Sequence, residues 1–554
     1  MPDIVLSTLN AKYLHASFGL RCLMANLGDL RGRAAILEFD INQRPLDIAE
    51  ALLAAAPRIL GLGVYVWNAT PTLELAAILR RLRPDLVLVL GGPEVSHEWD
   101  RQPIIALADH VITGEADLAF AALCRDLLSG SGPRPPKLIA APVPDVASLA
   151  QPYDLYDARD LEHRVVYVEA SRGCPFTCEF CLSSLDIPVR QFPLEPFLEA
   201  MQRLHDRGLR RFKFVDRTFN LNLATGRRIL GFFLERLSPG LFVHFEMIPD
   251  RLPAELRELI ARFPPGTLQF EVGLQTLDPR VEARIGRRQN HERLADNFRW
   301  LRHHSGVHLH ADLIAGLPGE TLESFGRGFD TVVAHGPQEI QVGILKRLRG
   351  TPIVRHDAEW AMVYNPNPPY EVLSTRTMDF GTLARLRRFS RFWDLFGNSG
   401  NFVESLPMLW QALGSEACGT TGTGSPFAAM LAWSDWLHAQ GVKGHGIALP
   451  RQYDLLWRWA VTVRGIPADR FGPAMARDWR RPGRMDLPAW LEPFAGSVLT
   501  PRRPVRLPRR QARHLGSDGG HAPAVGPDPA AGGTVEADLN GRGECPGVSR
   551  LTAE

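Results

Sequence analysis

The sequence predicts an α/β protein with an N-terminal doubly wound parallel sheet, a partial (β/α)6 barrel and a mainly helical C-terminal domain. Short apolar runs alternate with amphipathic stretches over about the first 350 residues, and this pattern is typical of parallel sheets covered by helices. After Tyr364 the alternation stops, and the sequence becomes helical and rich in tryptophan. A chain of 554 residues is also too long for one compact core.

The first domain is expected over residues 1–135. Helical patterns separate five strand-like apolar runs, which are Ile4–Leu6, Ala35–Phe39, Ile59–Val66, Leu86–Leu90 and Val111–Thr113. Ligands of open α/β sheets lie beyond the carboxyl ends of the strands. We therefore expect a site at the loops with Gly61–Gly63, Gly91-Gly92 and Gly114-Glu115. The fingerprint Gly-x-Gly-x-x-Gly is missing after the first strand, and no Walker A motif occurs, which disfavours a dinucleotide or P-loop site.

A proline-rich stretch indicates a linker over residues 136–159, and a second alternating series predicts a core over 160–360. Its candidate strands are Val165–Ala170, Arg211–Val215, Leu241–Met247, Leu268–Gly273, Val307–Ile314 and Glu339–Ile344. Six βα units in about 180 residues correspond to three-quarters of an eight-unit barrel, with functional groups expected at the strand ends.

Residues 361–500 are expected to form a helical domain. We favour burial of its tryptophans in a core of the domain's own; the alternative is a lid that closes the barrel mouth. The residues concerned are Trp393, Trp410, Trp433, Trp436, Trp457 and Trp459. Residues 501–554 contain few large apolar side chains, and we expect a disordered tail there.

The strongest signal is the segment Ser171–Cys181, in which Cys174, Cys178 and Cys181 follow a candidate strand. Spacings of three and two intervening residues allow one short loop to place three thiolates around one corner of a four-iron, four-sulfur ([4Fe-4S]) cubane. Such clusters ordinarily take four cysteines, so three leave one iron without a protein ligand. An open metal position is where a cofactor or substrate binds.

A structural zinc site and a plain electron-transfer cluster are the alternatives. Both need a fourth ligand, usually from a second cysteine pair or run. The remaining cysteines are distant from the motif, and none of them forms a second pair: Cys22, Cys124, Cys418 and Cys545. An odd number of cysteines with three in one short segment favours a metal or redox site in a reducing compartment over a disulfide scaffold.

The composition argues against several partner classes. A formal net charge of +2 gives no indication of a nucleic-acid partner. No apolar run approaches the length of a membrane span, and the N-terminus lacks the basic and apolar pattern of a secretion signal. We therefore expect a cytoplasmic protein without a membrane partner.

The cysteine motif resembles the Cys-x-x-x-Cys-x-x-Cys signature of radical S-adenosylmethionine (SAM) enzymes, including the aromatic Phe180 before the third cysteine. The resemblance covers residues of about 160 to 350 and agrees with the six βα units. It implies that SAM chelates the open iron of a [4Fe-4S] cluster and is cleaved reductively to a 5′-deoxyadenosyl radical. It also implies a small-molecule substrate and a reductant such as flavodoxin or ferredoxin.

The same resemblance implies SAM contacts at the strand ends. The candidate residues are Phe180, Asp216, Glu246, Glu271, Gln275 and Gly316. Phe180 and Gly316 would lie near the adenine, Asp216 near the amino group, and Glu246 near the ribose or substrate. Buried carboxylates and amides at barrel strand ends can equally be satisfied structural groups, and that alternative stays open.

The N-terminal domain resembles the cobalamin (B12)-binding domain fused to many radical SAM proteins, and the whole arrangement resembles a B12-binding radical SAM family with its own C-terminal domain. The resemblance implies cobalamin contacts at Gly63, Gly91, Gly92 and Glu115. The ligand motif Asp-x-His-x-x-Gly is not matched around His15, which could face cobalt or serve in packing.

With cobalamin bound, the resemblance implies methyl transfer to an unactivated centre as the leading chemistry. A radical SAM enzyme of cyclisation or rearrangement type without cobalamin is the second hypothesis. A non-catalytic, metal-stapled binding or electron-transfer protein is the third. The sequence does not reveal the substrate.

Overall fold

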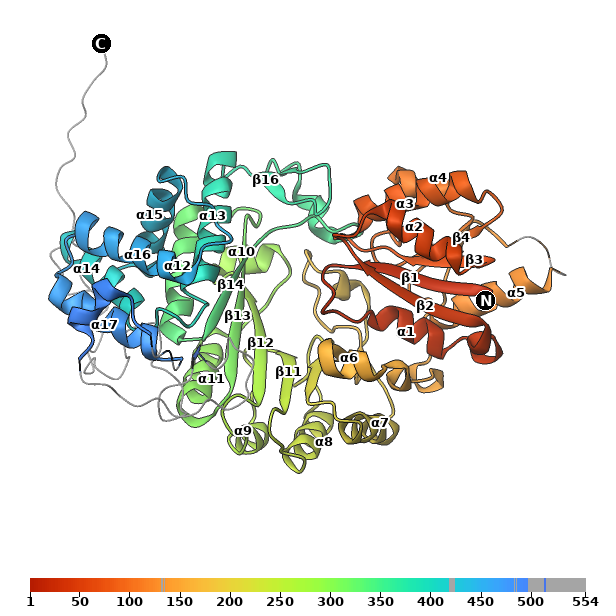
Figure 1. The fold of residues 1–554 in the computed structure, drawn as a ribbon, viewed down its shortest axis with the longest axis horizontal. Coiled ribbons are helices and arrows are strands. Elements are labelled where there is room, and N and C mark those ends of the chain that lie inside the picture. The colour runs from red at the N-terminus through yellow and green to blue at the C-terminus, as the bar shows by residue number, and fades with distance from the viewer. Residues whose placement is uncertain are drawn as a thin grey trace, which may run out of the picture.

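The computed structural model describes residues 1–130, 133, 135–417, 424–482, 484, 486–496 and 513–514. These residues form two six-stranded parallel sheets followed by a helical region. The N-terminal sheet lies at one end of the molecule and the C-terminal helices lie at the other, with the second sheet between them (Figure 1). The tail expected over 501–554 lies outside the described residues except for Arg513 and His514.

The N-terminal sheet has the strand order β2-β1-β3-β4-β5-β6, and every neighbouring pair is parallel. Its strands are β1 (Ile4–Asn10), β2 (Ala34–Asp40), β3 (Ile59–Gly63), β4 (Val87–Gly91), β5 (His110–Thr113) and β6 (Leu138–Ala140). Its main helices are α1 (Phe18–Ala25), α2 (Pro45–Ala54), α3 (Ala69–Leu82), α4 (Pro103–Leu107) and α5 (Asp117–Ser129). Apolar side chains of α1 and α5 bury one face of the sheet, and those of α2, α3 and α4 bury the other. The predicted doubly wound sheet is confirmed.

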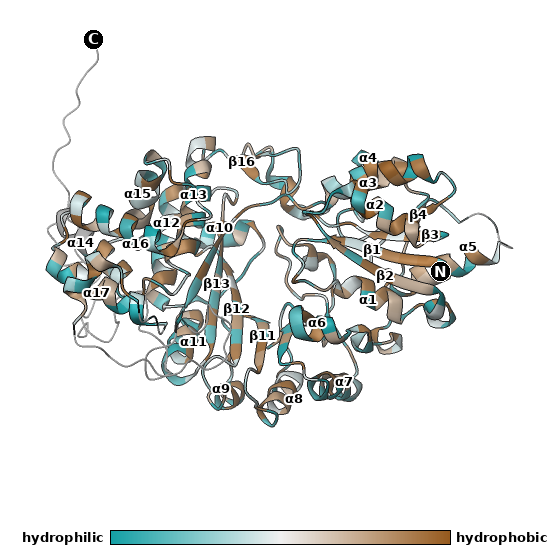
Figure 2. Ribbon diagram, viewed as in Figure 1, coloured by the Kyte–Doolittle hydropathy of each residue, from teal (hydrophilic) through white to brown (hydrophobic). Residues whose placement is uncertain are grey.

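The strand order reverses between β1 and β3, because β1 pairs with both β2 and β3. In doubly wound sheets the ligand crevice opens at this reversal, beyond the carboxyl ends of the strands. β1 is buried along its whole length, which fits a central strand covered on both faces. Figure 2 shows this strand as mostly brown, the colour of hydrophobic residues.

The segment 136–159, expected as a linker, contains the sixth strand of the N-terminal sheet. β6 pairs in parallel with β5 at the sheet edge, and Ile139 packs against the core on that side. Its apolar run is only three residues long and lies in a proline-rich stretch, so periodicity does not reveal it. An edge strand tolerates neighbouring prolines because one side of its backbone needs no partner.

The second sheet has the order β14-β13-β12-β11-β10-β7, again with parallel pairs throughout. Its strands are β7 (Val166–Val168), β10 (Arg211–Phe214), β11 (Phe242–Met247), β12 (Leu268–Gln275), β13 (His308–Ala315) and β14 (Glu339–Ile344). The helices between them are α7 (Leu194–Asp206), α8 (Leu223–Leu234), α9 (Ala254–Ile260), α10 (Pro279–Arg284), α11 (His291–His304) and α12 (Leu322–His335). The predicted partial (β/α)6 barrel is confirmed.

Alternation along the barrel strands assigns their faces. In β12, Phe270, Val272 and Leu274 are buried, whereas Glu271 and Gln275 between them are only half-buried. Because successive side chains of a strand point to opposite faces, the apolar set meets the helices and the polar set meets the barrel interior. Polar groups for a site therefore come from one face of each strand.

The helical region packs directly on the barrel. Its helices are α13 (Phe380–Phe396), α14 (Ser405–Ala417), α15 (Pro426–Ala439), α16 (Leu449–Trp457) and α17 (Ala468–Arg480). Trp393, Trp410, Trp433 and Trp459 are buried in a hydrophobic core that is continuous with that of the barrel, so these rings do not form a core of their own. The helices lie beyond β14, away from the N-terminal sheet, and not as a lid between the two sheets (Figure 1). No helix among the described residues is long and apolar enough to cross a membrane.

Glu320, which precedes α12, is a buried carboxyl group with one good partner. Thr276 donates a hydrogen bond to its Oε1 at 2.6 Å, and Oε2 has no hydrogen-bond partner within the described part of the chain. Burial raises the pKa of Glu320 to about 8. The neutral acid is therefore the form that the fold accommodates at pH 7.

Glu320→Gln is expected to remove a pH dependence of stability. A folded-state pKa above the unfolded value stabilises the fold at low pH, and this contribution is lost as pH rises from about 4.5 through about 8. The stability of the variant relative to the wild type should therefore increase by a few kcal/mol between pH 5 and pH 9. Denaturant unfolding at both pH values measures the difference, and a difference independent of pH would contradict the assignment.

Candidate active site

The three motif cysteines line one cavity of about 240 Å³ at the carboxyl ends of the barrel strands. Cys174 and Cys178 are buried, and Cys181 is half-buried. Burial raises the pKa of the Cys174 and Cys178 thiols. Arg287 opposes this effect at Cys178, because its Nη1 lies 3.6 Å from Cys178 Sγ. The positive charge beside this sulfur favours the thiolate, which is the form that binds metal.

The cysteine loop begins with a short two-stranded ribbon. β8 (Ser171–Arg172) pairs antiparallel with β9 (Arg190–Gln191), and the Cys174 amide donates a hydrogen bond to the Asp186 carbonyl at 3.0 Å. Gly173 has a φ of +89°, and a Cβ at this position would lie 2.6 Å from the Asp186 carbonyl oxygen. Only glycine fits this approach of two backbone segments. The ribbon therefore sets the direction in which the loop leaves towards Cys174.

The donor set fits a multi-iron cluster. Among the described residues, no group of three or more His, Cys, Asp or Glu side chains converges on a site for a single metal ion. Cys22 and Cys124 lie in α1 and α5 of the other domain, and Cys418 and Cys545 lie outside the described residues. No fourth cysteine lines this cavity in the part of the chain that the structure describes, so the three thiols are its only cysteine ligands there.

Four of the residues expected to contact SAM line the same cavity: Phe180, Glu246, Glu271 and Gln275. Arg217 Nη1 forms an ion pair with Glu246 Oε1 at 2.8 Å, and His244 Nε2 lies 2.9 Å from Glu271 Oε2. Burial alone would raise the pKa of Glu271, but the hydrogen bond and charge of His244 hold it below its usual range. The cavity therefore presents carboxylate acceptors from β11 and β12.

Asp312 faces this carboxylate pair from β13. Burial raises its pKa well above the usual range, and the charges of Glu271 and Glu246 raise it further. His310 Nε2 lies 3.5 Å from Asp312 Oδ1, so the carboxyl group has an imidazole as well as two carboxylates around it.

The structure places Asp216 elsewhere. It is buried, and its carboxylate accepts hydrogen bonds from the Ala170 amide at 3.0 Å and the Ser171 hydroxyl at 2.6 Å. It lines neither of the two large cavities. These hydrogen bonds fit the alternative of a satisfied structural group, which here anchors the start of the cysteine loop, and the neighbouring Arg217 lines the cavity.

Gly316 and His15 also lie outside the cavities for which they were expected. Gly316 packs against Val372, where an added Cβ would come within 2.6 Å of the valine side chain. His15 pairs with Val165 at the edge of the barrel, and its Nδ1 lies 2.7 Å from the Tyr167 hydroxyl. The loop after β1 thus docks the N-terminal domain onto β7, and this contact holds the imidazole away from the crevice.

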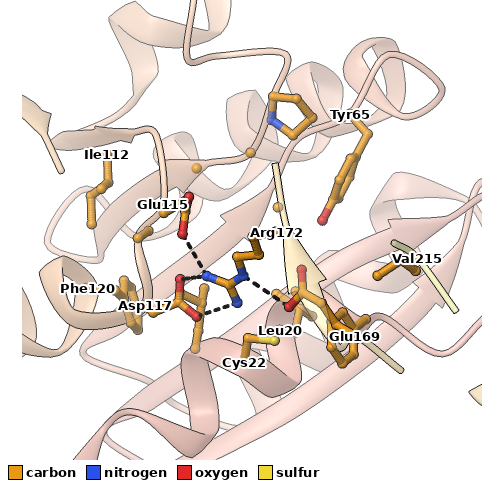
Figure 3. Close-up of a pocket in the computed structure, with 18 of the residues that line it drawn as sticks. Leu20, Cys22, Tyr65, Ile112, Glu115, Asp117, Phe120, Glu169, Arg172 and Val215 are labelled. Carbon is orange, nitrogen blue, oxygen red and sulfur yellow. Dashed lines mark hydrogen bonds and ion pairs between the residues drawn. The ribbon is translucent and has the colours of Figure 1, made fainter. Parts of the chain in front are cut away.

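A larger cavity of about 470 Å³ lies at the strand reversal of the N-terminal sheet, between this sheet and the barrel (Figure 3). Gly63, Gly91, Gly92 and Glu115 line it, as the sequence predicts. A Cβ at Gly92, whose φ is +106°, would lie 2.5 Å from the Val64 carbonyl oxygen. The loop after β4 can therefore approach the end of β3 only with glycine at this position.

A charged cluster forms one wall of the larger cavity (Figure 3). Arg172 makes ion pairs with Glu115 at 2.8 Å, Asp117 at 2.9 Å and Glu169 at 3.0 Å. Burial raises the pKa of Glu169 to about 7, against the opposing effect of Arg172. Figure 3 also shows Tyr65 from the far side of the cavity pointing towards this cluster.

The two cavities share Ser183 and Arg217 in their walls. Arg217 was not predicted from the sequence, although it lies three residues after the end of β10 and functional groups are expected near strand ends. No sequence pattern indicated a role for Arg172 or Arg287, because Asp117 and Cys178, with which they interact, lie in distant parts of the chain.

Comparisons with known proteins agree with this arrangement. The model of the radical SAM superfamily matches residues 168–331, and that of the B12 binding domain matches residues 4–124. A third model, described as a protein of unknown function (DUF4080), matches residues 358–492. These matches correspond to the barrel, the N-terminal sheet and the helical region.

Two curated relatives illustrate the sequence similarity. An uncharacterized methyltransferase of Pyrococcus horikoshii is 26% identical over 305 residues, which cover 50% of this chain and 64% of that protein. The cobalamin-dependent radical SAM methyltransferase TokK of Streptomyces tokunonensis is 24% identical over 341 residues, covering 52% and 47%. The chain thus spans about half to two thirds of the length of these relatives.

Two solved structures share the fold. The cobalamin-dependent SAM radical enzyme OxsB, with aqua-cobalamin and SAM bound, superposes with a TM-score of 0.56 at 14% identity over 86% of this chain and 84% of its own. The radical SAM methyltransferase TsrM from Kitasatospora setae, with cobalamin and a [4Fe-4S] cluster bound, gives 0.52 at 18% identity over 66% and 76%.

Proposed function

We propose that this chain, a radical SAM protein with an N-terminal B12-binding domain and a separate C-terminal domain, is a cobalamin-dependent methyltransferase that reductively cleaves SAM. The observation that carries the proposal is the pair of adjoining cavities, one lined by the three cysteines and the other at the strand reversal of the B12-binding domain. Arg217 and Ser183 line both. A group bound in one cavity can therefore react with a molecule held at the other.

The cysteine cavity would hold the cluster and SAM. Cys174, Cys178 and Cys181 would ligate three irons of a [4Fe-4S] cluster, with Arg287 stabilising the Cys178 thiolate. SAM carries a positive sulfonium and an amino group, and the carboxylates of Glu246 and Glu271 suit both by charge. When bound, the cluster supplies the electron that breaks a carbon–sulfur bond of SAM, and cobalamin carries the methyl group.

Glu271 and Asp312 are two carboxyl groups of the SAM cavity that would hydrogen-bond the polar parts of SAM. The His244 side chain keeps Glu271 ionised, so that it accepts hydrogen bonds. Burial and the charges of Glu271 and Glu246 raise the pKa of Asp312 instead. The two carboxyl groups thus have different electrostatic surroundings, and both can hydrogen-bond a polar part of SAM such as its ribose.

Cobalamin would occupy the larger cavity, with Gly63, Gly91 and Gly92 leaving room for its nucleotide tail and Glu115 also in the cavity wall. A small-molecule substrate would lie at the junction of the cavities. Arg217 uses one donor on Glu246 and its side chain is half exposed there, so it can orient such a substrate. We also propose that flavodoxin or ferredoxin is the reductant and that the protein works in the cytoplasm. The five described cysteines are free thiols, which supports a reducing compartment.

Anaerobic reconstitution tests the proposal. We expect about four irons per chain, uptake of hydroxocobalamin with corrin absorbance, and release of 5′-deoxyadenosine after addition of dithionite and SAM. Transfer of label from methyl-labelled SAM to cobalamin would support methyl transfer. Nucleoside release without any cobalamin binding would favour the cyclisation or rearrangement hypothesis, and a lone zinc ion at the cysteines would reject the radical mechanism.

A further inference from the structure

We propose that Arg172 is a positioning residue that couples occupancy of the larger cavity to the binding of SAM at the cysteine loop. This inference rests on the proposed function, because it assigns cobalamin to the larger cavity and SAM to the smaller one. It adds that binding of the two cofactors is mutually favourable, and it names the ion-pair cluster that connects them.

Arg172 belongs to the barrel side of the molecule but has two of its partners in the B12-binding domain. Its Nη1 lies 2.8 Å from Glu115 Oε2 and 2.9 Å from Asp117 Oδ2, and its Nε lies 3.0 Å from Glu169 Oε2. The arginine side chain is 12% exposed. All four residues line the larger cavity, and the dashed lines of Figure 3 show how the guanidinium bridges them. A ligand in this cavity therefore changes the surroundings of the whole cluster.

The same arginine stands two residues before Cys174. Its neighbour Ser171 donates a hydrogen bond to Asp216, on the barrel, at 2.6 Å. Successive residues of an extended segment point to opposite sides. Ser171 thus holds the start of the cysteine loop to the barrel, and Arg172 holds it to Asp117 of the B12-binding domain.

The second strand of the ribbon reaches the same acidic group. Arg190 of β9 makes ion pairs with Glu115 and Asp186, and the Asp186 carbonyl accepts the Cys174 amide hydrogen. Glu115 is therefore bonded to one residue on each strand of the ribbon that leads into the cysteine loop. A displacement of the loop that contains Glu115 and Asp117 would move both strands together.

Ion pairs gain strength when water is excluded. A cofactor that fills the larger cavity displaces water beside Arg172 and its carboxylates. A charge that has lost its water is strongly unfavourable without a partner, so the paired arrangement is favoured over an unpaired one. The paired arrangement is the one in which the cysteine loop is held between the two domains. Cobalamin binding should therefore favour the loop geometry present in this structure, and linkage requires that SAM bound at that loop favours cobalamin equally.

A second contact between the domains provides a matched control. Arg349 makes ion pairs with Glu94 at 2.8 Å and with Glu98 at 3.3 Å, which connects the loop after β14 to the loop after β4. Arg349 lines neither cavity, and its hydrogen-bond partners among the described residues are Glu94, Glu98 and Tyr370, none of which belongs to the cysteine loop. A loss of domain docking in general would affect this contact and the Arg172 cluster alike.

The test measures SAM affinity with and without hydroxocobalamin by equilibrium dialysis of labelled SAM, on protein with an oxidised cluster that does not cleave SAM. In the wild type we expect cobalamin to tighten SAM binding at least fivefold, and SAM to tighten cobalamin binding by the same factor. In Arg172→Gln both factors should fall to about one while iron content is retained. Arg172→Lys keeps the charge but cannot bridge Glu169 and Asp117, so it should restore the coupling only in part. Arg349→Gln should keep the full factor.

Three results would overturn the proposal: no coupling in the wild type, full coupling in Arg172→Gln, or equal loss in Arg172→Gln and Arg349→Gln. Should Arg172→Gln fail to fold, Asp117→Asn removes the other side of the same ion pair and should give the same loss. A wild-type protein that binds no cobalamin at all would fail at the proposed function, which the corrin absorbance reports separately from the coupling.

Discussion

Cys178→Ala is expected to abolish release of 5′-deoxyadenosine, by more than about 10³-fold, together with most of the iron bound after reconstitution. Cys178 is the buried thiol beside Arg287, and the guanidinium lies 3.6 Å from its sulfur. Its loss leaves two thiols for a cluster that needs three protein ligands here. It also leaves the positive charge of Arg287 facing a methyl group.

Cys124→Ala is the matched control for this variant. Cys124 is also a buried cysteine, but it lies in α5 among the apolar residues that cover the N-terminal sheet and lines neither cavity. It should keep both iron and nucleoside release at wild-type levels. Nucleoside release that persists in Cys178→Ala would reject the cluster assignment.

Gly91→Phe is expected to weaken cobalamin binding by at least about a hundredfold, or ~2.7 kcal/mol, without loss of iron or of SAM cleavage. Gly91 ends β4 and lines the larger cavity. The nearest atom to an added Cβ is the Ile112 carbonyl oxygen at 3.8 Å, so the backbone accommodates a side chain. A benzyl group there occupies space in a cavity of about 470 Å³ that the nucleotide tail of cobalamin would need.

Gly91 is a better position for this experiment than Gly92. The positive φ and close backbone contact of Gly92 would distort the loop, and a loss of binding would then have two explanations. Gly32→Phe is the control, since Gly32 is exposed in the same domain and an added Cβ meets no atom within 4 Å. Titration of hydroxocobalamin by absorbance measures both variants, and unchanged affinity in Gly91→Phe would place cobalamin elsewhere.

Hydrophobic periodicity within single segments was sufficient to predict most strands of the two sheets. β12 was predicted over Leu268–Gly273 and extends over Leu268–Gln275, because an alternating strand with one buried face is visible in its own sequence. β6 was missed because three residues in a proline-rich stretch are too few to show the alternation of a strand. Its place in the sheet depends on pairing with β5, which is a tertiary contact.

The residues of the candidate site also differ in whether local sequence patterns could predict their positions. Gly91, Gly92 and Glu115 could be placed at the crevice because strand order and strand ends follow from topology. For Asp216 and His15 the sequence left ligand contact and structural packing both open, because a strand-end position does not say which of several neighbours the side chain contacts.

The arginines show the limit most clearly. Arg172 meets Asp117, 55 residues away, across a domain boundary. No periodicity or spacing in one segment encodes such a pairing. The tryptophans of the helical region likewise share the core of the barrel, a property that depends on how α13 packs beside β14 rather than on helical pattern alone.

The most direct test of the account is an electron spin relaxation measurement on protein loaded with both cob(II)alamin and the [4Fe-4S] cluster. Because the two cavities share Ser183 and Arg217, the cofactors would be neighbours. We predict that reduction of the cluster accelerates relaxation of the cob(II)alamin signal, and that Gly91→Phe, loaded in the same way, lacks this signal. A cob(II)alamin signal whose relaxation is the same with oxidised and reduced cluster would contradict the placement of the two cofactors in adjoining cavities.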